Sequence, residues 1–302
     1  HCFGSRGRRG KRIEILHGKL MKRLNLLLLT VICLSLIFNA SGCGKGVFAP
    51  KQQPLPTPTP ISPLEGWTLV WHDEFDDAQI DRQNWTFDIG GNGWGNGEMQ
   101  YYTDRPENAR TENGLLVIEA RQEKYGGSYY TSARLKSQGL QEFQYGRLEG
   151  RLKVPEGKGF WPAFWMLGSN FATAGWPDCG EIDIMEFLGK EPDLIMGTLH
   201  GPGYSGALGL SKWNRQTYSI AEDFHTYAIE WDQNQITWFY DGDAYHTVTR
   251  EDVGNRPWVF DQPFFFILNL AVGGTLGGMV SPQTVFPSQY LVDYVRVYEK
   301  QP

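Results

Sequence analysis

Much of the chain beyond residue 64 consists of short runs in which apolar and polar side chains alternate. Residues 146–154 read Gly-Arg-Leu-Glu-Gly-Arg-Leu-Lys-Val, so small or apolar residues alternate with charged ones. This period of two predicts a strand with one face in the core and the other in water. Residues 227–231 and 235–240 are also strand-like, and the Asp-Gln-Asn between them predicts that they form a hairpin.

Other runs are rich in β-branched and aromatic residues, and no long stretch shows the period of a helix. These runs are residues 115–120, 264–270 and 290–298, and Asp241-Gly242 adds a turn signal after the hairpin. So many strands in one unit predict an all-β sandwich of two antiparallel sheets. If one sheet is curved, its concave face offers a cleft in which a chain-like ligand can lie.

The first 43 residues differ in character from the rest. Met21 is followed by a basic pair, an apolar run at 24–38 and small residues up to Cys43. A short basic head, an apolar centre of this length and a small-residue end predict an export signal over 21–43. The apolar run is too short for a comfortable membrane span. We expect translation to begin at Met21, so we interpret residues 1–20 as an upstream artefact.

The signal ends in Ala-Ser-Gly-Cys at 40–43, which resembles a bacterial lipobox. In that interpretation Cys43 becomes a lipidated N-terminus, and acyl chains tether an exported protein to the cell surface or outer membrane. The alternative is cleavage at the same small residues and release as a secreted protein. Residues 44–63 contain alternating prolines and predict a semi-rigid linker. The folded domain is expected to span residues 64–300.

Charge separates the leader from the domain. Residues 1–43 hold 8 Lys and Arg and one acidic residue, so the remaining chain holds 20 basic and 33 acidic residues, a net charge of −13. This acidity argues against nucleic acid and sulfated glycans as partners. All 11 Trp lie beyond residue 66, and such an excess of indole rings favours flat, neutral ligands, with sugars as the leading class. Cys179 is the one domain cysteine, which we interpret as a small structural residue.

The sharpest chemical signal is Glu-Ile-Asp-Ile-Met-Glu at 181–186. Side chains alternate across a strand, so Glu181 and Asp183 share a face while Glu186 of a regular strand points away. One extra residue at Ile184-Met185, a β-bulge, returns Glu186 to the face of Glu181. The two glutamate carboxyls then end ~5–6 Å apart, which is the separation found in retaining glycosidases.

In that geometry the acids take three roles and need no cofactor. Glu181 is the nucleophile that attacks the anomeric carbon, and Glu186 protonates the leaving oxygen and then deprotonates water. Asp183 lies between them, where its charge holds Glu186 protonated and its hydrogen bonding orients Glu181. The alternatives are a solvated acidic strand, which the apolar neighbours weaken, and a calcium site.

Two further segments carry candidate sugar-binding residues. Trp161 and Trp165 stand four residues apart, so an extended backbone puts both on one face, where they stack on sugar rings or pack in the core. Residues 90–102 are too rich in glycine for a helix and predict a loop with positive φ angles. That loop either brings Asn92 and Trp94 to the cleft or is a structural turn.

With these segments, the sequence resembles glycoside hydrolase family 16, in particular its bacterial laminarinases, which are endo-β-1,3-glucanases. The resemblance extends over nearly all of the domain. Its motifs are the segments 90–102, 160–168 and 181–186, Tyr-Thr-Ser-Ala-Arg at 130–134 and Asn-Leu-Ala-Val-Gly-Gly at 269–274. It implies a β-jelly roll and the roles given above to the three acids. The extra Met185 resembles the bulged subgroup rather than the lichenan-specific members.

The resemblance also implies which residues bind substrate. By motif these would be Arg134, Asn92, Trp161, Trp165 and His200, of which His200 is alternatively a core histidine. After Gly-Gly at 273–274 many laminarinases have Trp-Pro-Gly, whereas this chain has Thr-Leu-Gly-Gly at 275–278. This departure leaves the preferred glucan open.

A structural calcium on the convex side is a further implication of the resemblance. Its ligands would be the backbone oxygens of Glu74 and Gly114 and the side chain of Asp293. Oxygen ligands of this kind suit calcium.

The sequence as a whole predicts a retaining endo-β-1,3-glucanase that hydrolyses laminarin-type β-glucans by double displacement, acting as a monomer. Alternatives are a family relative that acts on mixed-linkage glucan or on agar or carrageenan galactans, a transglycosylase, and a non-catalytic glucan-binding jelly roll. The net charge of −13 disfavours sulfated chains. Three costly acids disfavour a protein that only binds.

Overall fold

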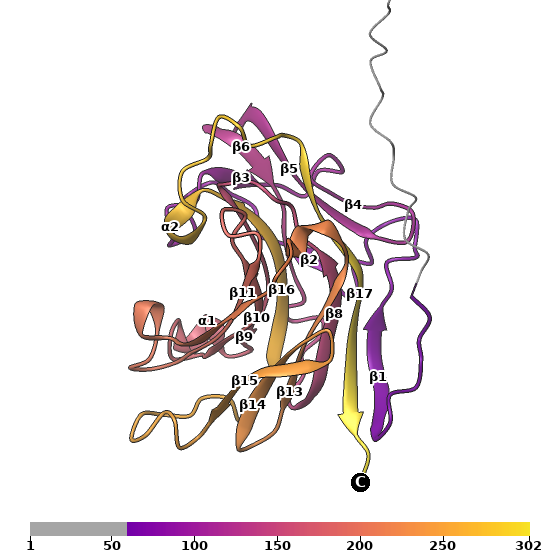
Figure 1. Ribbon diagram of the computed structural model, residues 1–302, viewed down its shortest axis with the longest axis vertical. Coiled ribbons are helices and arrows are strands. Elements are labelled where there is room, and N and C mark those ends of the chain that lie inside the picture. Colours follow the sequence, from indigo (N-terminus) through magenta and orange to yellow (C-terminus); the bar gives the residue numbers. More distant parts are fainter. Residues whose placement is uncertain (1–58) are drawn as a thin grey trace, which may run out of the picture. The chain divides into compact units, whose positions relative to one another are not determined.

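A computed structural model describes residues 59–302; the expected export signal over 21–43, the lipidation candidate Cys43 and the linker up to residue 58 lie outside the described residues. The described part is almost entirely β-structure, built as two layered sheets (Figure 1). Within residues 59–302 no helix is long and apolar enough to cross a membrane. The helices are short: α1 (Phe171–Ala174), α2 (Gly274–Gly277) and the 3-10 turns η1 (Gly206–Leu208) and η2 (Ile220–Glu222).

The larger sheet has ten strands in the order β15-β14-β13-β8-β17-β5-β6-β3, with β1 paired to β17 and β4 to β5. Its strands are β1 (Trp67–Asp73), β3 (Gln100–Tyr102), β4 (Ala109–Thr111), β5 (Leu116–Tyr125), β6 (Ser128–Ser132), β8 (Gly146–Lys153), β13 (His225–Trp231), β14 (Gln235–Tyr240), β15 (Asp243–Thr249) and β17 (Ser288–Lys300). The second sheet has seven strands in the order β12-β11-β10-β9-β16-β7-β2. They are β2 (Thr86–Phe87), β7 (Arg134–Lys136), β9 (Phe160–Gly168), β10 (Glu181–Phe187), β11 (Leu194–His200), β12 (Leu210–Arg215) and β16 (Phe264–Val272).

The strands predicted from alternation and β-rich runs are confirmed as β5, β8, β13, β14, β16 and β17, each within a few residues of its expected bounds. β13 and β14 form the expected hairpin. Asp241 and Gly242 then turn the chain into β15 with φ angles of 48° and 88°. Positive φ at both central residues is what a tight hairpin turn requires, and an Asp-Gly pair supplies it at low cost. The all-β sandwich is therefore confirmed.

β16 shows how the sheets divide their two faces. All nine of its residues are buried. Phe264, Phe266, Leu268, Leu270 and Val272 lie in the main core between the sheets. The alternate residues face the other way, where Phe265 and Ile267 pack with Cys179 and Leu167, and Asn269 and Ala271 line a cavity. The period of two therefore places one side of β16 in the core and the other on the face that carries the site. The buried position of Cys179 agrees with its predicted structural role.

The predicted wet face of β8 holds only for Arg151 and Lys153, which are partly exposed. Arg147 and Glu149 are only 7% and 9% exposed. β8 lies between β13 and β17, so its charged side chains find partners on both neighbours. Arg147 donates to Glu149 at 2.7 Å and to Glu230 at 3.1 Å, and the Tyr294 hydroxyl donates to Glu149 at 2.9 Å. Paired charges on central strands cover one another, which the alternation of a single strand does not reveal.

Candidate active site

β10 carries the bulge that the sequence predicts. Its register shifts between Asp183 and Met185 toward β9, and between Asp183 and Glu186 toward β11. Ile184 and Met185 are both buried in the core, with 1% and 0% of their surface exposed. Because two successive residues point into the core, Glu186 returns to the cavity face with Glu181 and Asp183. The prediction of three acids in one groove is confirmed.

The opposite sheet holds this bulge in place. The carbonyl of Asp183 accepts a 2.8 Å hydrogen bond from Nε1 of Trp238, a fully buried side chain on β14. Gly197 on β11 makes room for the indole, because a Cβ there would lie 2.5 Å from the ring. The position of Asp183 therefore depends on contacts across the whole sandwich.

The acids open into a cavity of about 380 Å³ on the seven-stranded sheet. Such a volume is typical of ligand sites, which combine aromatic walls with a few polar groups. Its walls come from the glycine-rich loop, β7, β9, β10, β16 and the segment around α1. They are Trp94, Gly95, Asn96, Glu98, Arg134, Trp161, Ala163, Trp165, Leu167, Phe171, Trp176, Glu181, Asp183, Glu186, Asn269 and Ala271.

Burial shifts the protonation of all three acids. Desolvation, reinforced by the charge of Asp183, raises the pKa of Glu181 well above its ordinary value. Desolvation raises the pKa of Asp183 to about 8, and together with the charge of Asp183 it raises the pKa of Glu186 to about 8. Glu186 therefore carries its proton at neutral pH, as a general acid must. The charge of His200 and a hydrogen bond from Trp176 lower the pKa of Glu181 but do not outweigh its burial, so the three carboxyls share their protons as one coupled group.

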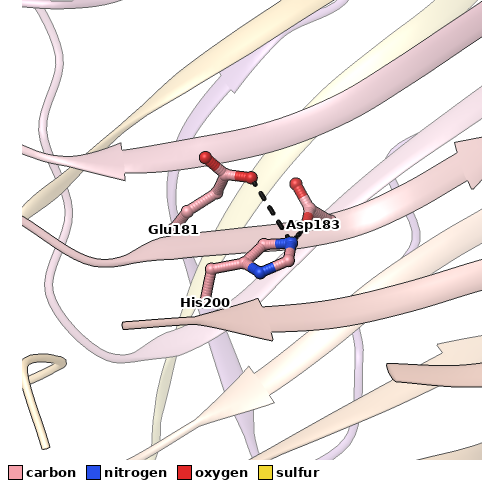
Figure 2. Close-up of side chains that lie close together, drawn as sticks. All are labelled: Glu181, Asp183 and His200. Carbon is pink, nitrogen blue, oxygen red and sulfur yellow. Dashed lines mark ion pairs between the residues drawn. The ribbon is translucent and has the colours of Figure 1, made fainter. Parts of the chain in front are cut away.

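His200, at the end of β11, lies beside the acids rather than in the cavity wall. Its Nε2 is 3.3 Å from Oδ2 of Asp183 and 3.7 Å from Oε1 of Glu181 (Figure 2). The pairing of Glu181 with His200 across β10 and β11 brings them together. The imidazole of His200 therefore contacts the two carboxylates, and its predicted contact with substrate stays a prediction.

Both predicted tryptophans of β9 are half-buried on the cavity face. Trp161 donates its Nε1 hydrogen to Oε1 of Glu186 at 3.0 Å, and Trp165 donates to Oδ1 of Asn269 at 2.7 Å. The guanidinium of Arg134 lies 4.8 Å from the Trp165 ring centre and 5.1 Å from that of Trp94. Trp161, Trp165, Trp94 and Arg134 therefore line the cavity, and their predicted binding of substrate stays a prediction.

The glycine-rich loop contributes differently from the prediction. Gly90, Gly93, Gly95 and Gly97 all have positive φ, as expected of this loop. Asn92, however, is exposed and is not part of the cavity wall, whereas Asn96 is. The successive positive φ angles turn the chain so that Asn92 faces solvent.

Glu98 is a fourth buried carboxyl at the cavity, and sequence reasoning missed it. Its carboxylate accepts hydrogen bonds from Gln100 at 2.6 Å, the Tyr102 hydroxyl at 3.0 Å and Asn96 at 3.3 Å. Burial raises the pKa of Glu98. Asn269 donates to the Tyr102 oxygen at 3.2 Å, which connects Glu98 to the wall formed by Trp165. The available signal was the spacing of Glu98, Gln100 and Tyr102, which an extended chain puts on one face. Trp176 and Phe171, near α1, were also missed because nothing local marks them.

The strand pairings put the three expected calcium positions beside the same stretch of β17. The pairing of Asp73 with Val295 places Glu74 near Asp293, and that of Leu116 with Val292 does the same for Gly114. Asp293 lies where the register of β17 shifts. Its Oδ2 also accepts hydrogen bonds from Arg151 at 2.8 Å and from Thr59 at 2.6 Å. The set of oxygen donors fits a hard cation, which would share the carboxylate with the guanidinium.

Known proteins resemble the chain over most of its length. The family model described as Glycosyl hydrolases family 16 matches residues 96–296. A beta-glucanase of Rhodothermus marinus is 49% identical over 244 residues, which cover 77% of this chain and 85% of that protein. The endo-beta-1,3-glucanase structure from Pyrococcus furiosus has a TM-score of 0.75 at 49% identity, covering 78% of this chain and 95% of that one. The laminarinase catalytic domain from Thermotoga maritima has a TM-score of 0.76 at 48% identity, covering 79% and 100%. The bulged strand of acids, its aromatic cavity and these similarities show that the chain belongs to glycosyl hydrolases family 16.

Proposed function

We propose that this glycoside hydrolase is a retaining endo-β-1,3-glucanase of laminarin-type glucans. One observation carries the proposal: the bulge of β10 turns Glu181, Asp183 and Glu186 into the same aromatic cavity. The named relatives act on β-glucans, which supports the substrate class. An acidic domain with a tryptophan-lined cavity also suits a neutral polysaccharide.

The reaction follows from the environments of the two glutamates. In the reactive protonation state Glu181 is ionised and Glu186 holds the proton that the group shares; Glu186 gives this proton to the glycosidic oxygen while Glu181 attacks the anomeric carbon and forms a glycosyl-enzyme. Glu186, now ionised, takes a proton from water, which attacks the same carbon and releases Glu181. The Trp161 hydrogen bond to Oε1 of Glu186 fixes the acid during both steps. Asp183 raises the pKa of Glu186 and so keeps the acid protonated until it is needed.

The cavity walls supply the sugar contacts. Trp161 and Trp165 offer ring faces, and Arg134 is held between Trp94 and Trp165 by an ion pair to Asp88 at 3.0 Å. His200 acts through Glu181 and Asp183, and Asn92 would reach only sugars that extend beyond the cavity.

A panel of three polysaccharides tests the substrate class. We expect reducing ends from laminarin, with Glu181→Gln and Glu186→Gln each lowering kcat by several orders of magnitude and Asp183→Asn lowering it less. Hydrolysis of lichenan or agarose without hydrolysis of laminarin would move the enzyme to another substrate within the family. Binding to laminarin without any hydrolysis would favour the non-catalytic glucan-binding protein. Near-normal turnover in either glutamine variant would overturn the roles.

Calcium is proposed as a structural ion held by the backbone of Glu74 and Gly114 and by Asp293. It would tie β17 to the ends of β1 and β5 and take no part in hydrolysis. Removing it with a chelator should lower Tm, and Asp293→Asn should remove that sensitivity. An unchanged Tm in the presence of the chelator would contradict the ion.

Export and attachment are proposed from the sequence of residues 21–43. Cys43 would carry the lipid and residues 44–63 would space the domain, which spans 64–300, from the membrane; without lipid the protein would be secreted. Fractionation of cells that express the chain should place it with membranes, and Cys43→Ser should release it.

A monomer is proposed as well, and sedimentation of the released domain tests this oligomeric state.

A further inference from the structure

The cluster of Glu181, Asp183 and His200 has a feature that glycoside hydrolysis does not use. Oδ2 of Asp183 and Nδ1 of His200 are buried and have no hydrogen-bond partner. Asp183 is only 4% exposed, and this oxygen lies 3.3 Å from Nε2 of His200, within ion-pair distance but without hydrogen-bond geometry (Figure 2). Buried polar atoms without partners are rare and call for a physical reason.

The cluster has the dimensions of a metal site. Among the described residues it is the one group of three or more His, Cys, Asp or Glu side chains whose ligand atoms all lie within 4.8 Å of one another. Nε2 of His200 is 3.3 Å from the Asp183 oxygen and 3.7 Å from the Glu181 oxygen. A tetrahedral Zn²⁺ with bonds of about 2.0–2.2 Å holds its ligand atoms about 3.3 Å apart. Small side-chain rotations would therefore complete three of the four positions.

The donors select the kind of ion. One imidazole nitrogen and two carboxylate oxygens suit Zn²⁺ and similar first-row divalent cations. Ca²⁺ and Mg²⁺ prefer six or more oxygen ligands, which this cluster does not offer. The fourth position would face the cavity, because Glu181 and Asp183 both line its wall. A cation here would also neutralise acids that crowd one another in a buried site.

We propose that Glu181, Asp183 and His200 form an inhibitory site for a divalent transition-metal ion such as Zn²⁺. The inference rests on the proposed function in one respect: the oxygen that would bind the ion belongs to the nucleophile Glu181. Coordination withdraws electron density from the whole Glu181 carboxylate and fixes its orientation, so that neither oxygen attacks the anomeric carbon effectively. The metal would therefore inhibit hydrolysis reversibly, and a chelator would restore the activity.

Titration calorimetry of the full chain with ZnCl₂ at neutral pH tests the site independently of activity. We expect wild-type protein to bind one more equivalent of Zn²⁺ than His200→Gln, with Asp183→Asn weakening the same equivalent at least tenfold. His72→Ala is the matched control, because His72 lies 3.2 Å from a single carboxylate, Glu74, and its side chain is 45% exposed. That variant should bind as the wild type does. Circular dichroism of each variant verifies that it is folded.

Activity measured in the same titration separates this inference from the proposed function. Laminarin hydrolysis should fall as the His200-dependent equivalent fills and return with EDTA, while equal Ca²⁺ or Mg²⁺ should have no such effect. If folded His200→Gln and Asp183→Asn bind Zn²⁺ as the wild type does, the metal site is wrong even though hydrolysis stands. If the His200-dependent equivalent binds but metal-free enzyme does not hydrolyse glucan, the metal site stands and the proposed function fails.

Discussion

At the scale of single residues, Asp183 shifts the pKa values of both glutamates of the cavity. Asp183 stands between the two glutamates in the strand, and all three side chains are shielded from water. The negative charge of Asp183 is therefore weakly screened and acts on both glutamates. Desolvation is the largest cause that raises the pKa of Glu181 and of Glu186, and the charge of Asp183 is the second largest. A pair of acids tuned in this way shares its protons, and its pH profile belongs to the group as a whole.

Removing that charge should move the pH optimum toward acid. In Asp183→Asn the pKa of Glu186 falls from about 8, so the acid loses its proton at lower pH and the alkaline limb of the rate profile shifts down. The pKa of Glu181 falls too, so the acidic limb moves in the same direction. The profile of kcat/KM against pH on laminarin measures both limbs. An optimum that stays in place or moves to higher pH would contradict the role of Asp183.

The same shifts affect stability. Asp183 has a folded pKa of about 8, above its unfolded value, so the stability that it contributes is present in acid and is lost as pH rises through the folded pKa. An asparagine does not ionise and avoids this loss. Thermal unfolding of Asp183→Asn and wild type should therefore give similar Tm values near pH 4 and a higher Tm for the variant at pH 8. A variant with the lower Tm at pH 8 would show that the carboxylate is not destabilising.

At the scale of elements, the bulge of β10 is what turns an ordinary core strand into an active-site strand. Ile184 and Met185 both enter the core, so the acids on either side of them share the cavity face. Because side chains alternate, the number of residues between Asp183 and the second glutamate decides where that glutamate points.

Deletions in the bulge test this count. Deleting Met185 leaves Glu-Ile-Asp-Ile-Glu, in which a regular strand keeps all three acids on one face. We expect a folded enzyme with reduced activity and with a loss of about 2–5 kcal/mol from the vacated core position. Deleting Ile184 and Met185 together puts Glu186 next to Asp183 and on the opposite face, so hydrolysis should vanish. Laminarin assays and Tm values of both variants check this, and an inactive but folded Met185 deletion would argue against it.

Alternation explains which parts of the structure could be predicted from the sequence. Strands such as β16 can be predicted from local patterns. The bulge can be predicted as well, because it is what puts all three acids of an otherwise apolar strand on the face outside the core. The contact of His200 with Asp183 depends on the register between β10 and β11, which no local pattern encodes. Asn96 and Glu98 line the cavity whereas Asn92 does not, because backbone angles within the glycine-rich loop decide which side chains turn inward. Burial of Arg147 and Glu149 likewise depends on neighbours distant in sequence.

At the scale of the whole molecule, the two sheets cooperate to place the acids. Trp238 reaches from β14 of the ten-stranded sheet to the backbone of Asp183 on β10 of the other sheet. The catalytic strand therefore keeps its bulge through the packing of the entire core, and stability and activity are linked.

The substitution Trp238→Phe should lower both the stability and the activity of the enzyme. It leaves the Asp183 carbonyl without its buried donor, at a cost of about 1–3 kcal/mol, in addition to the smaller ring. We also expect kcat to fall, because the carboxyl group of Asp183 shifts when its backbone carbonyl is no longer held. Trp231→Phe is the matched control: Trp231 is a buried tryptophan of the same sheet whose Nε1 has no hydrogen-bond partner. Chemical denaturation and kcat of the two variants should differ, and equal effects would show that the hydrogen bond is unimportant.

Proton NMR of the first sugar released from laminarin tests the central claim most directly, because the anomeric signal reports which face of the carbon the water attacked. A bulge that sets Glu181 and Glu186 close together on one cleft predicts that the new reducing end appears first as the β-anomer and only later mutarotates. Initial formation of the α-anomer would mean that water attacks directly, and that these two glutamates do not act as nucleophile and acid.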